Sequence, residues 1–315
     1  MSPYLSTILI GFCCFCFSLT CLSQSSKPLF EAIRNNDVAQ VRSLIAGGAD
    51  INSRDEDSDN VFMYAALYSS PETMQMLLQK GVDINARNKS GETALMWCMH
   101  DRKKIDLLLK NGADINVVAN SGNTPLFVAC VGSDQYDIVR TLLDKGANPL
   151  ARSNKKETVL MRAAMFGDTS TVSLLLQKGI DVNAQDQDGM TALMHAVLNS
   201  NRPVALQLIE HGADPDIFMS AGISSLDFAV IYNDEQIVKA MLGKTRNVNR
   251  VTAGGYSPLM WATYNEYDNT KIVKALLDKG ADVNFKSSDG STALSWAQKK
   301  GKTATVVLLT QAGAK

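Results

Sequence analysis

The chain has 315 residues, of which 45% are hydrophobic and 20% are charged, as in a folded domain. Its 31 Lys and Arg residues nearly balance its 32 Asp and Glu residues, which leaves a formal net charge of −1. Sequence-independent nucleic-acid binding requires a basic surface, so this balance excludes it as an expectation and no nucleic-acid partner is predicted.

Residues 1–23 differ from everything that follows them. The run from Leu5 to Leu22 has no charged residue and is rich in Leu, Ile, Phe and Cys, which is typical of a secretory signal peptide, here cleaved after Ser23. Two alternatives stay open: an uncleaved membrane anchor, which the length allows, and lipidation of Cys21. All three predict a periplasmic, secreted or membrane-anchored protein, with a membrane tether in the last two cases.

From residue 24 to residue 315 the chain repeats itself. An aligned apolar position recurs with a period of about 33 residues. A fixed period of this size predicts one elongated repeat domain rather than two compact domains. The aligned positions are Leu29, Phe62, Leu95, Leu126, Leu160, Leu193, Leu226, Leu259 and Leu294.

Each unit has the pattern of two helices. A small residue lies three places after the aligned apolar residue, as Ala163 follows Leu160, and allows two helices to approach closely. A second, amphipathic helix then ends at a Gly, as at Gly179, which favours the left-handed conformation of a helix C-terminus. The Gly and the next aligned residue are always 14 residues apart, whereas the helical half varies from 17 to 21 residues. Thr245 replaces this Gly in the seventh unit.

These motifs resemble the ankyrin repeat. The resemblance is carried by Thr124-Pro125-Leu126, Thr191-Ala192-Leu193, Ser257-Pro258-Leu259 and the Gly-Ala-Asp segments that begin at Gly112 and Gly280. It implies an all-α, ankyrin-repeat solenoid of about nine helix-turn-helix units joined by β-hairpin-like fingers. The units would start near residues 28, 55, 88, 119, 153, 186, 219, 252 and 287. The signal-like start and the Met-rich motif favour a bacterial source.

The chain departs from the family pattern in three ways. Met or Phe, as in Met161 and Phe127, replaces the His that follows the aligned Leu, which predicts apolar packing in place of a hydrogen bond. The third unit is two residues short and the eighth is two residues long, so we expect these two to be the least regular. The last unit needs a polar outer face, and Lys299, Lys300 and Lys302 are predicted to supply it.

No constellation for catalysis or for a cofactor is found. His100, His195 and His211 belong to different units and lack metal-ligand spacing. Cys98 and Cys130 stand where other units have Ala, so we expect buried small residues rather than redox or metal chemistry. Asp186 and Asp188 are predicted to serve a turn. The protein is therefore predicted not to be an enzyme.

The strongest functional pattern is an apolar stripe along the inner, concave side of units five to eight. In the family it resembles, the ends of the first helices and the adjacent finger positions face the groove. Contiguous apolar surface with aromatic anchors is typical of binding sites. The predicted stripe is Met165, Phe166, Met190, Leu198, Ile223, Ile231, Tyr232, Tyr256 and Tyr264. Trp97, Trp261 and Trp296 share one repeat position, and we expect them to pack within the solenoid.

These observations favour a non-enzymatic, monomeric protein-protein interaction module that binds a partner protein outside the cytoplasm through its groove and finger tips. The alternative is an inhibitor or immunity-type protein that blocks an enzyme in the same compartment. Acidic residues on the second finger, Asp55 to Asp59, and Lys155-Lys156 on the fifth would influence the rate and orientation of association more than affinity. The fold alone does not identify a partner.

Overall fold

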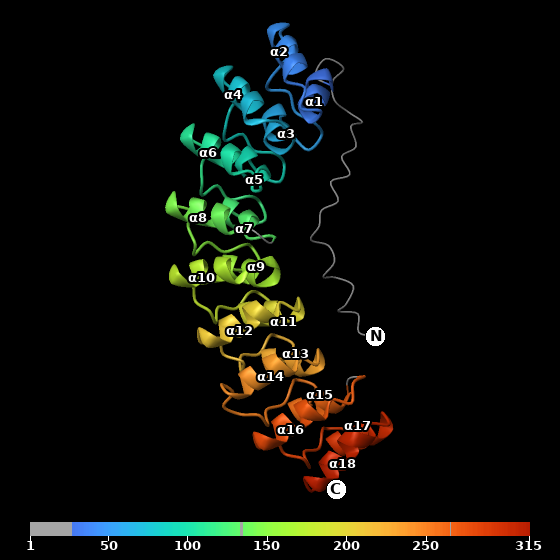
Figure 1. The fold of residues 1–315 in the computed structure, drawn as a ribbon. Coiled ribbons are helices and arrows are strands. Elements are labelled where there is room, and N and C mark those ends of the chain that lie inside the picture. The colour runs from blue at the N-terminus through green and yellow to red at the C-terminus, as the bar shows by residue number, and fades with distance from the viewer. Residues whose placement is uncertain (1–26, 133–134, 265) are drawn as a thin grey trace.

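The computed structural model describes residues 27–132, 135–264 and 266–315. Within these ranges the chain forms eighteen helices and no strands, stacked into one curved column (Figure 1), which confirms the predicted all-α solenoid. Residues 1–23, with the predicted signal peptide or anchor and the predicted lipidation site Cys21, lie outside the described residues.

The helices alternate between two rows, which we call inner and outer. The inner row lies on the concave side in Figure 1 and consists of α1 (Lys27–Arg34), α3 (Val61–Tyr68), α5 (Ala94–Trp97), α7 (Pro125–Ala129), α9 (Val159–Phe166), α11 (Ala192–Leu198), α13 (Ser225–Ile231), α15 (Pro258–Tyr264) and α17 (Ala293–Lys299). The outer row consists of α2 (Val38–Ala46), α4 (Pro71–Gln79), α6 (Arg102–Lys110), α8 (Tyr136–Asp144), α10 (Thr169–Gln177), α12 (Arg202–Glu210), α14 (Glu235–Leu242), α16 (Thr270–Asp278) and α18 (Thr303–Gln311).

The core runs as a continuous seam between units. Each inner helix packs against the next inner helix, and in every unit except the third, whose inner helix is short, the inner helix also packs against its own outer helix. The aligned residues Leu160, Leu193 and Leu226 are fully buried in this seam, and so are the small residues Ala163 and Ala196 beside them. Because these side chains are covered by the neighbouring unit, the apolar face of one unit is buried only in the stack.

Polar residues begin the helices as the sequence pattern requires. The side chains of Thr158, Thr191 and Ser224 accept a hydrogen bond from the N–H three residues later, at the start of α9, α11 and α13. Asp168 and Asp234 cap the outer helices α10 and α14 in the same way. Each cap satisfies an N–H group that has no partner inside the helix.

Most outer helices are followed by the left-handed Gly that the sequence predicts. Gly179 has a φ of 76° and Gly212 a φ of 88°, a region that costs other residues strain. Thr245 avoids this conformation, because its N–H bonds to the Met241 carbonyl at 2.8 Å. Its hydroxyl donates to Asp216 of the preceding connector.

The fingers are short and hairpin-like, as predicted. Isolated antiparallel bridges join Arg54 to Asn60, Arg152 to Thr158 and Phe218 to Ser224. Backbone bonds also link successive fingers from the second to the seventh, ending with Ser220 N–H to the Asp188 carbonyl at 2.7 Å. We call this series the finger ladder.

Asparagine side chains form a second ladder between connectors. Asn183 donates to the Gly212 carbonyl at 3.2 Å and accepts from the Asp214 N–H at 2.8 Å. Asn85, Asn116, Asn249 and Asn284 repeat both bonds with the following unit. The exposed Leu150 and the carboxylate of Asp216 occupy the equivalent positions in two units. The asparagine ladder therefore fixes five of the connectors to the unit that follows.

The expected irregularity of the third unit is confirmed, because α5 has only four residues.

The predicted lysine cap is wrong for Lys302, which is buried and donates from Nζ to the Tyr267 carbonyl at 2.5 Å in the preceding unit. Lys300 also turns back, toward Glu266. Exposed polar residues Ser295 and Thr310 stand where unit six has the buried Met194 and Ile209, so they supply the outer face.

Removing one rung of the asparagine ladder should destabilise the array. We expect Asn183→Ala to lower the free energy of unfolding by about 1 to 3 kcal/mol, because it leaves the Gly212 carbonyl and the Asp214 N–H without their partner. Urea unfolding followed by circular dichroism measures the change.

The converse substitution is Leu150→Asn, which places an amide where a rung is missing. Leu150 is 61% exposed, so little burial is lost. We expect this variant to match or exceed the stability of the parent. Equal destabilisation by both substitutions would contradict the ladder as a source of stability.

Candidate protein-binding groove

The predicted stripe is accessible to solvent. Phe166, Tyr232 and Tyr264 are 41%, 47% and 50% exposed, which is unusual for aromatic side chains of a folded domain. They stand at or just beyond the C-terminal ends of α9, α13 and α15, on the inner row. The other six residues are half-buried: Met165, Met190, Leu198, Ile223, Ile231 and Tyr256. All nine therefore have side-chain surface open to solvent, and their role in binding stays a prediction.

An aromatic cluster lies at the C-terminal end of the groove. The ring centroid of Tyr256 is 5.5 Å from that of Trp261 and 4.9 Å from that of Trp296. Tyr264 lies 5.8 Å from Trp261 and 5.2 Å from Trp296. The tryptophans thus pack across units eight and nine, as predicted. Their half-buried rings also hold Tyr256 and Tyr264 in place, a connection that the sequence did not reveal.

A lysine closes one side of this cluster. Lys300 Nζ lies 4.9 Å from the ring centroid of Tyr264 and 3.1 Å from a carboxylate oxygen of Glu266. Such a cation over an aromatic face contributes about 0.5 to 1 kcal/mol at an exposed site. Lys300 therefore restrains the most exposed ring of the stripe.

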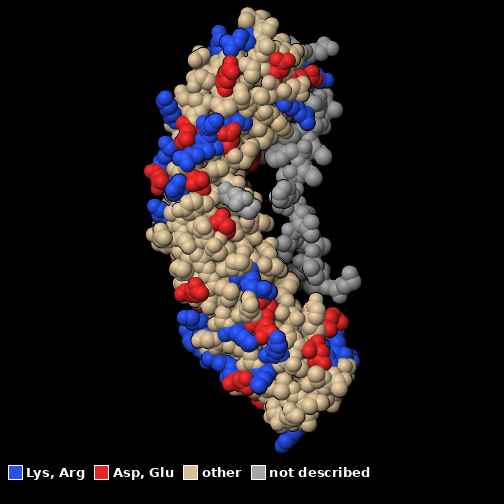
Figure 2. Space-filling view, in the orientation of Figure 1, with Lys and Arg blue, Asp and Glu red and all other residues tan. Residues whose placement is uncertain are grey.

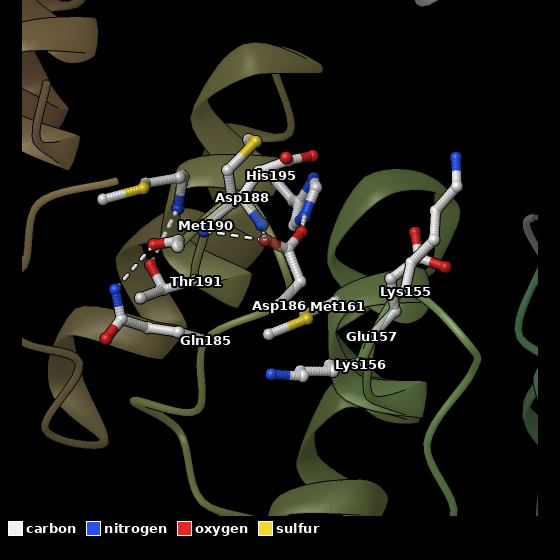
Figure 3. Close-up of polar contacts among 12 residues, drawn as sticks. Lys155, Lys156, Glu157, Met161, Gln185, Asp186, Asp188, Met190, Thr191 and His195 are labelled. Carbon is white, nitrogen blue, oxygen red and sulfur yellow. Dashed lines mark hydrogen bonds and ion pairs between the residues drawn. The ribbon is translucent and has the colours of Figure 1, made fainter. Parts of the chain in front are cut away.

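The sixth finger shows how a finger is held together. Asp186 accepts hydrogen bonds from the N–H groups of Asp188 and Met190, both at 2.9 Å, and its second oxygen lies 3.1 Å from Nε2 of His195 (Figure 3). Burial opposes ionisation of Asp186, but these hydrogen bonds outweigh it and hold the pKa of the carboxyl below its ordinary value. The predicted turn role of Asp186 is confirmed.

The fifth finger is basic at its tip and acidic at its base. Lys155 and Lys156 are exposed and point in different directions in Figure 3, whereas Glu157 is buried and pairs with Arg162 at 3.2 Å. Lys156 has a φ of 60°, where the next finger has Gly189. A charged residue in this conformation costs about 1 kcal/mol relative to Gly. The finger tip keeps its positive charge despite that cost.

The second finger is acidic. Asp59 is buried at its base and accepts a hydrogen bond from Asn88 at 2.7 Å. Burial raises the pKa of Asp59 to about 6; the hydrogen bond from Asn88 opposes the rise, and the charges of Asp55, Asp57 and Glu92 add to it. This carboxyl is therefore destabilised when it is ionised.

A buried charged cluster joins units six to eight. Arg250 lies 3.1 Å from Asp216, and its guanidinium stacks on the ring of Phe218 at 4.6 Å. Asp227, 1% exposed, accepts hydrogen bonds from the N–H and hydroxyl of Ser224. Burial raises the pKa of Asp227, against the hydrogen bonds from Ser224 and the charge of Arg250. Other units have Met, Phe or Ser at the position of Asp227 and an uncharged residue at that of Arg250, so the cluster is specific to this place.

The sequence pattern missed several exposed or aromatic side chains. Phe218 and Val251 are 36% and 40% exposed on fingers seven and eight. A second aromatic group lies near the N-terminus, where Tyr64 contacts Phe30, Tyr68 and Trp97 with centroid distances of 4.8, 5.9 and 6.2 Å. Most fingers hold Arg, Gln or Lys at the position of Phe218 and Val251, a contrast that an alignment of the units makes visible.

Metal chemistry has no support in the described ranges, where no group of three or more His, Cys, Asp or Glu residues could hold an ion. Cys98 and Cys130 are free and buried, and burial raises the pKa of both thiols to about 12.

The predicted packing of Met161, Met194 and Phe127 is confirmed by their burial. Among the described residues, no helix combines the length and apolar character needed to cross a bilayer.

Charge is distributed unevenly over the column. Charged side chains gather toward the two ends of the face shown in Figure 2, and the band between them has few. The outer helix α10, Thr169–Gln177, contributes to that band because it contains no charged residue. On this face a sparsely charged band therefore separates two regions that carry charges of both signs.

The repeats match a known family model. The model for ankyrin repeats in three copies matches residues 29–119, 62–153, 147–219 and 226–315. The mitochondrial disaggregase of Bos taurus is 35% identical over 146 residues, which cover 44% of this chain and 21% of that protein. The similarity therefore spans about a fifth of that relative's length.

Neutralising Asp59 should change the pH dependence of stability. The pKa of about 6 lies above the ordinary value of 3.8, so the folded state binds more protons between these values. The corresponding stability is fully present below pH 4 and is lost as the pH rises through 6. We expect Asp59→Asn to be more stable than the parent at pH 7, on the order of 2 kcal/mol, and to show a flatter profile from pH 4 to 7.

Urea unfolding at half-unit pH steps measures both effects. Asparagine keeps an acceptor for Asn88, so the finger contact is conserved. Glu56→Gln, on the exposed tip of the same finger, is the control and should leave the slope unchanged. Parallel profiles for parent and Asp59→Asn would show that this carboxyl does not control the dependence.

Proposed function

Because the chain belongs to the ankyrin repeat family, we propose that it is a non-enzymatic binding protein that holds a partner protein in its concave groove. Arrays of ankyrin repeats are protein-protein interaction modules. The finer assignment, to the groove of units five to eight, concerns this chain alone. This assignment follows from which side chains of the chain are exposed to solvent.

The exposure of Phe166, Tyr232 and Tyr264 supports this proposal most directly. Each has between 41% and 50% of its surface open to solvent and stands at or just beyond the end of an inner-row helix. Met165 and Ile231, each the residue before one of these rings, are half-buried. Fully burying one aromatic ring against a partner is worth about 1.5 to 3 kcal/mol. Three such rings can therefore supply the anchors of a specific interface.

The finger tips complete the proposed interface as its polar rim. Lys155 and Lys156 bring positive charge to one end of the stripe, and Asp188 brings negative charge to the next finger. Rim charges of this kind act mainly on association rate and orientation. We propose that they orient the partner, while the apolar stripe provides affinity.

We further propose that the protein acts as a monomer outside the cytoplasm. The motivation is the uncharged run from Leu5 to Leu22, which is typical of an export signal. An inhibitor or immunity-type role is the special case in which the captured partner is an enzyme. An activity assay on the captured protein distinguishes it from simple binding.

Removing the exposed rings should abolish partner capture without unfolding the chain. We expect the triple variant Phe166→Ala, Tyr232→Ala and Tyr264→Ala to lose at least about a hundredfold in affinity, since each ring contributes a kcal/mol or more. Tyr256 is left unchanged because it is half-buried against Trp261 and Trp296, whereas Tyr264, which contacts the same rings, is 50% exposed. The measurement is quantitative capture from an extracellular or periplasmic fraction, with circular dichroism to confirm the fold.

The matched control replaces Val307, which is 51% exposed on the outer helix α18, by Gln. It removes a comparable exposed apolar side chain away from the groove and should retain capture. Full capture by the triple variant would refute binding through this stripe.

The intact mass of the mature protein tests export. A polypeptide that begins at Gln24 is expected for signal-peptide cleavage, and an acyl group on Cys21 for lipidation. Full-length protein retained in the membrane fraction indicates an uncleaved anchor. An unprocessed chain recovered from the cytosol would overturn the proposed compartment.

A further inference from the structure

Fingers seven and eight lack the side-chain donor that links most other fingers to the finger that follows. At the first finger position, Arg54, Arg87 and Arg152 donate to a carbonyl of the following finger, and Gln185 donates to the Phe218 carbonyl at 3.0 Å. The next two residues in this series are Phe218 and Val251, whose side chains have no donor. Two interfinger hydrogen bonds are thus replaced by exposed apolar side chains.

Among the described residues, no backbone bond of the finger ladder takes the place of these two hydrogen bonds. Finger four also has Val118 at the same position, but Asn120 and Asn154 hold it by hydrogen bonds of 2.7 Å to neighbouring carbonyls. The finger ladder itself ends at Ser220, on finger seven. A departure from local consistency without a compensating gain is expected at functional sites.

The same two fingers carry no ionisable group at their tips. Residues 217–226 contain none, and residues 251–264 contain only tyrosines. Together with the ends of α13 and α15 they form what we call the neutral patch: Phe218, Ile223, Tyr232, Val251, Tyr256 and Tyr264. Placing an unpaired charge of a partner against such a surface would cost several kcal/mol. Two cations contact the patch, Arg250 on Phe218 and Lys300 on Tyr264, and both are paired with a carboxylate, Asp216 and Glu266. The patch therefore favours an uncharged, apolar occupant.

Exposed charges of opposite sign stand at the two ends of the patch. Asp188 lies on finger six, one unit before it, and Lys299 ends α17, one unit after it. Packed helices are about 10 Å apart, so three steps from unit six to unit nine span about 30 Å. An extended chain rises about 3.3 Å per residue and covers that span with roughly nine residues.

We propose that the neutral patch binds an extended, mainly apolar protein segment of roughly nine residues, with a basic residue facing Asp188 and an acidic residue facing Lys299. This inference rests on the proposed function and specifies its partner. The buried cluster of Arg250 and Asp216 supports the patch from below, since Arg250 stacks on Phe218. This stacking keeps Phe218 in place although fingers seven and eight lack the interfinger hydrogen bonds of the other fingers.

The first test separates binding from stability. Phe218→Gln and Val251→Lys copy the residues found at the same position of fingers six and nine, Gln185 and Lys286. The new Gln has carbonyls to donate to, as Gln185 does at 2.8 and 3.0 Å. We expect the double variant to melt at or above the temperature of the parent while segment binding falls by about tenfold or more.

The probe is a display library of random twelve-residue peptides, selected on the immobilised chain. Enriched peptides should share an apolar centre with Lys or Arg on one side and Asp or Glu on the other. Asp188→Lys should change the favoured residue at that end from basic to acidic. Val307→Gln, outside the patch, should select the same peptides as the parent.

Peptides that bind the double variant as tightly as the parent would overturn this inference, and so would enrichment without the opposed charges. If the selected peptides depend on Phe166 instead of Phe218 and Val251, the groove binds but the neutral patch is not the site. A separate experiment tests the proposed function: full partner capture by the triple variant Phe166→Ala, Tyr232→Ala and Tyr264→Ala would refute it.

Discussion

No unit of this chain buries its own apolar face, and the whole structure depends on how adjacent units close that face together. The hydrogen bonds of the finger ladder and the asparagine ladder both cross from one connector to the next, so each bond fixes the spacing of its neighbours. This explains why Gly179 and Leu193, like their equivalents, stay 14 residues apart. The inner helices are free to vary in length, from four residues in α5 to eight in α1.

Departures from the repeat pattern are tolerated where a neighbouring unit supplies the missing partner. Thr245 lacks the left-handed geometry of Gly, and Asp216 lacks the amide of Asn, yet the Thr hydroxyl donates to the Asp carboxylate. Lys104 is buried, but its ammonium group donates to the Ala66 carbonyl at 2.8 Å, at the end of the previous unit's inner helix. A buried polar group without such a partner would cost about 1 to 3 kcal/mol.

The regular part of the fold could be predicted from the sequence because it depends on what recurs. The aligned leucines, the small residues and the Gly positions each appear in most units, and they determine the stacking. Contacts between residues that deviate from the repeat pattern could not be predicted in this way. Lys302 looked like a surface cap, and its burial depends on the carbonyl of Tyr267 in a unit with its own insertion. Arg250 and Asp227 are 23 residues apart, and the charge of Arg250 acts on the Asp227 carboxyl only because the fold brings the two side chains near each other.

The hydrogen bonds between successive fingers also make one end of the groove stiffer than the other. From finger two to finger seven, backbone and side-chain donors connect each tip to the next, so a partner meets a surface whose shape is already set. Beyond Phe218 the tips are held by packing on Arg250 and on the rings around Trp261. Binding to a preorganised surface costs less conformational entropy, whereas a compliant one can adapt to different side chains. Apolar contact tolerates small shifts that a hydrogen bond does not, so the placement of apolar residues on the less constrained fingers is physically consistent.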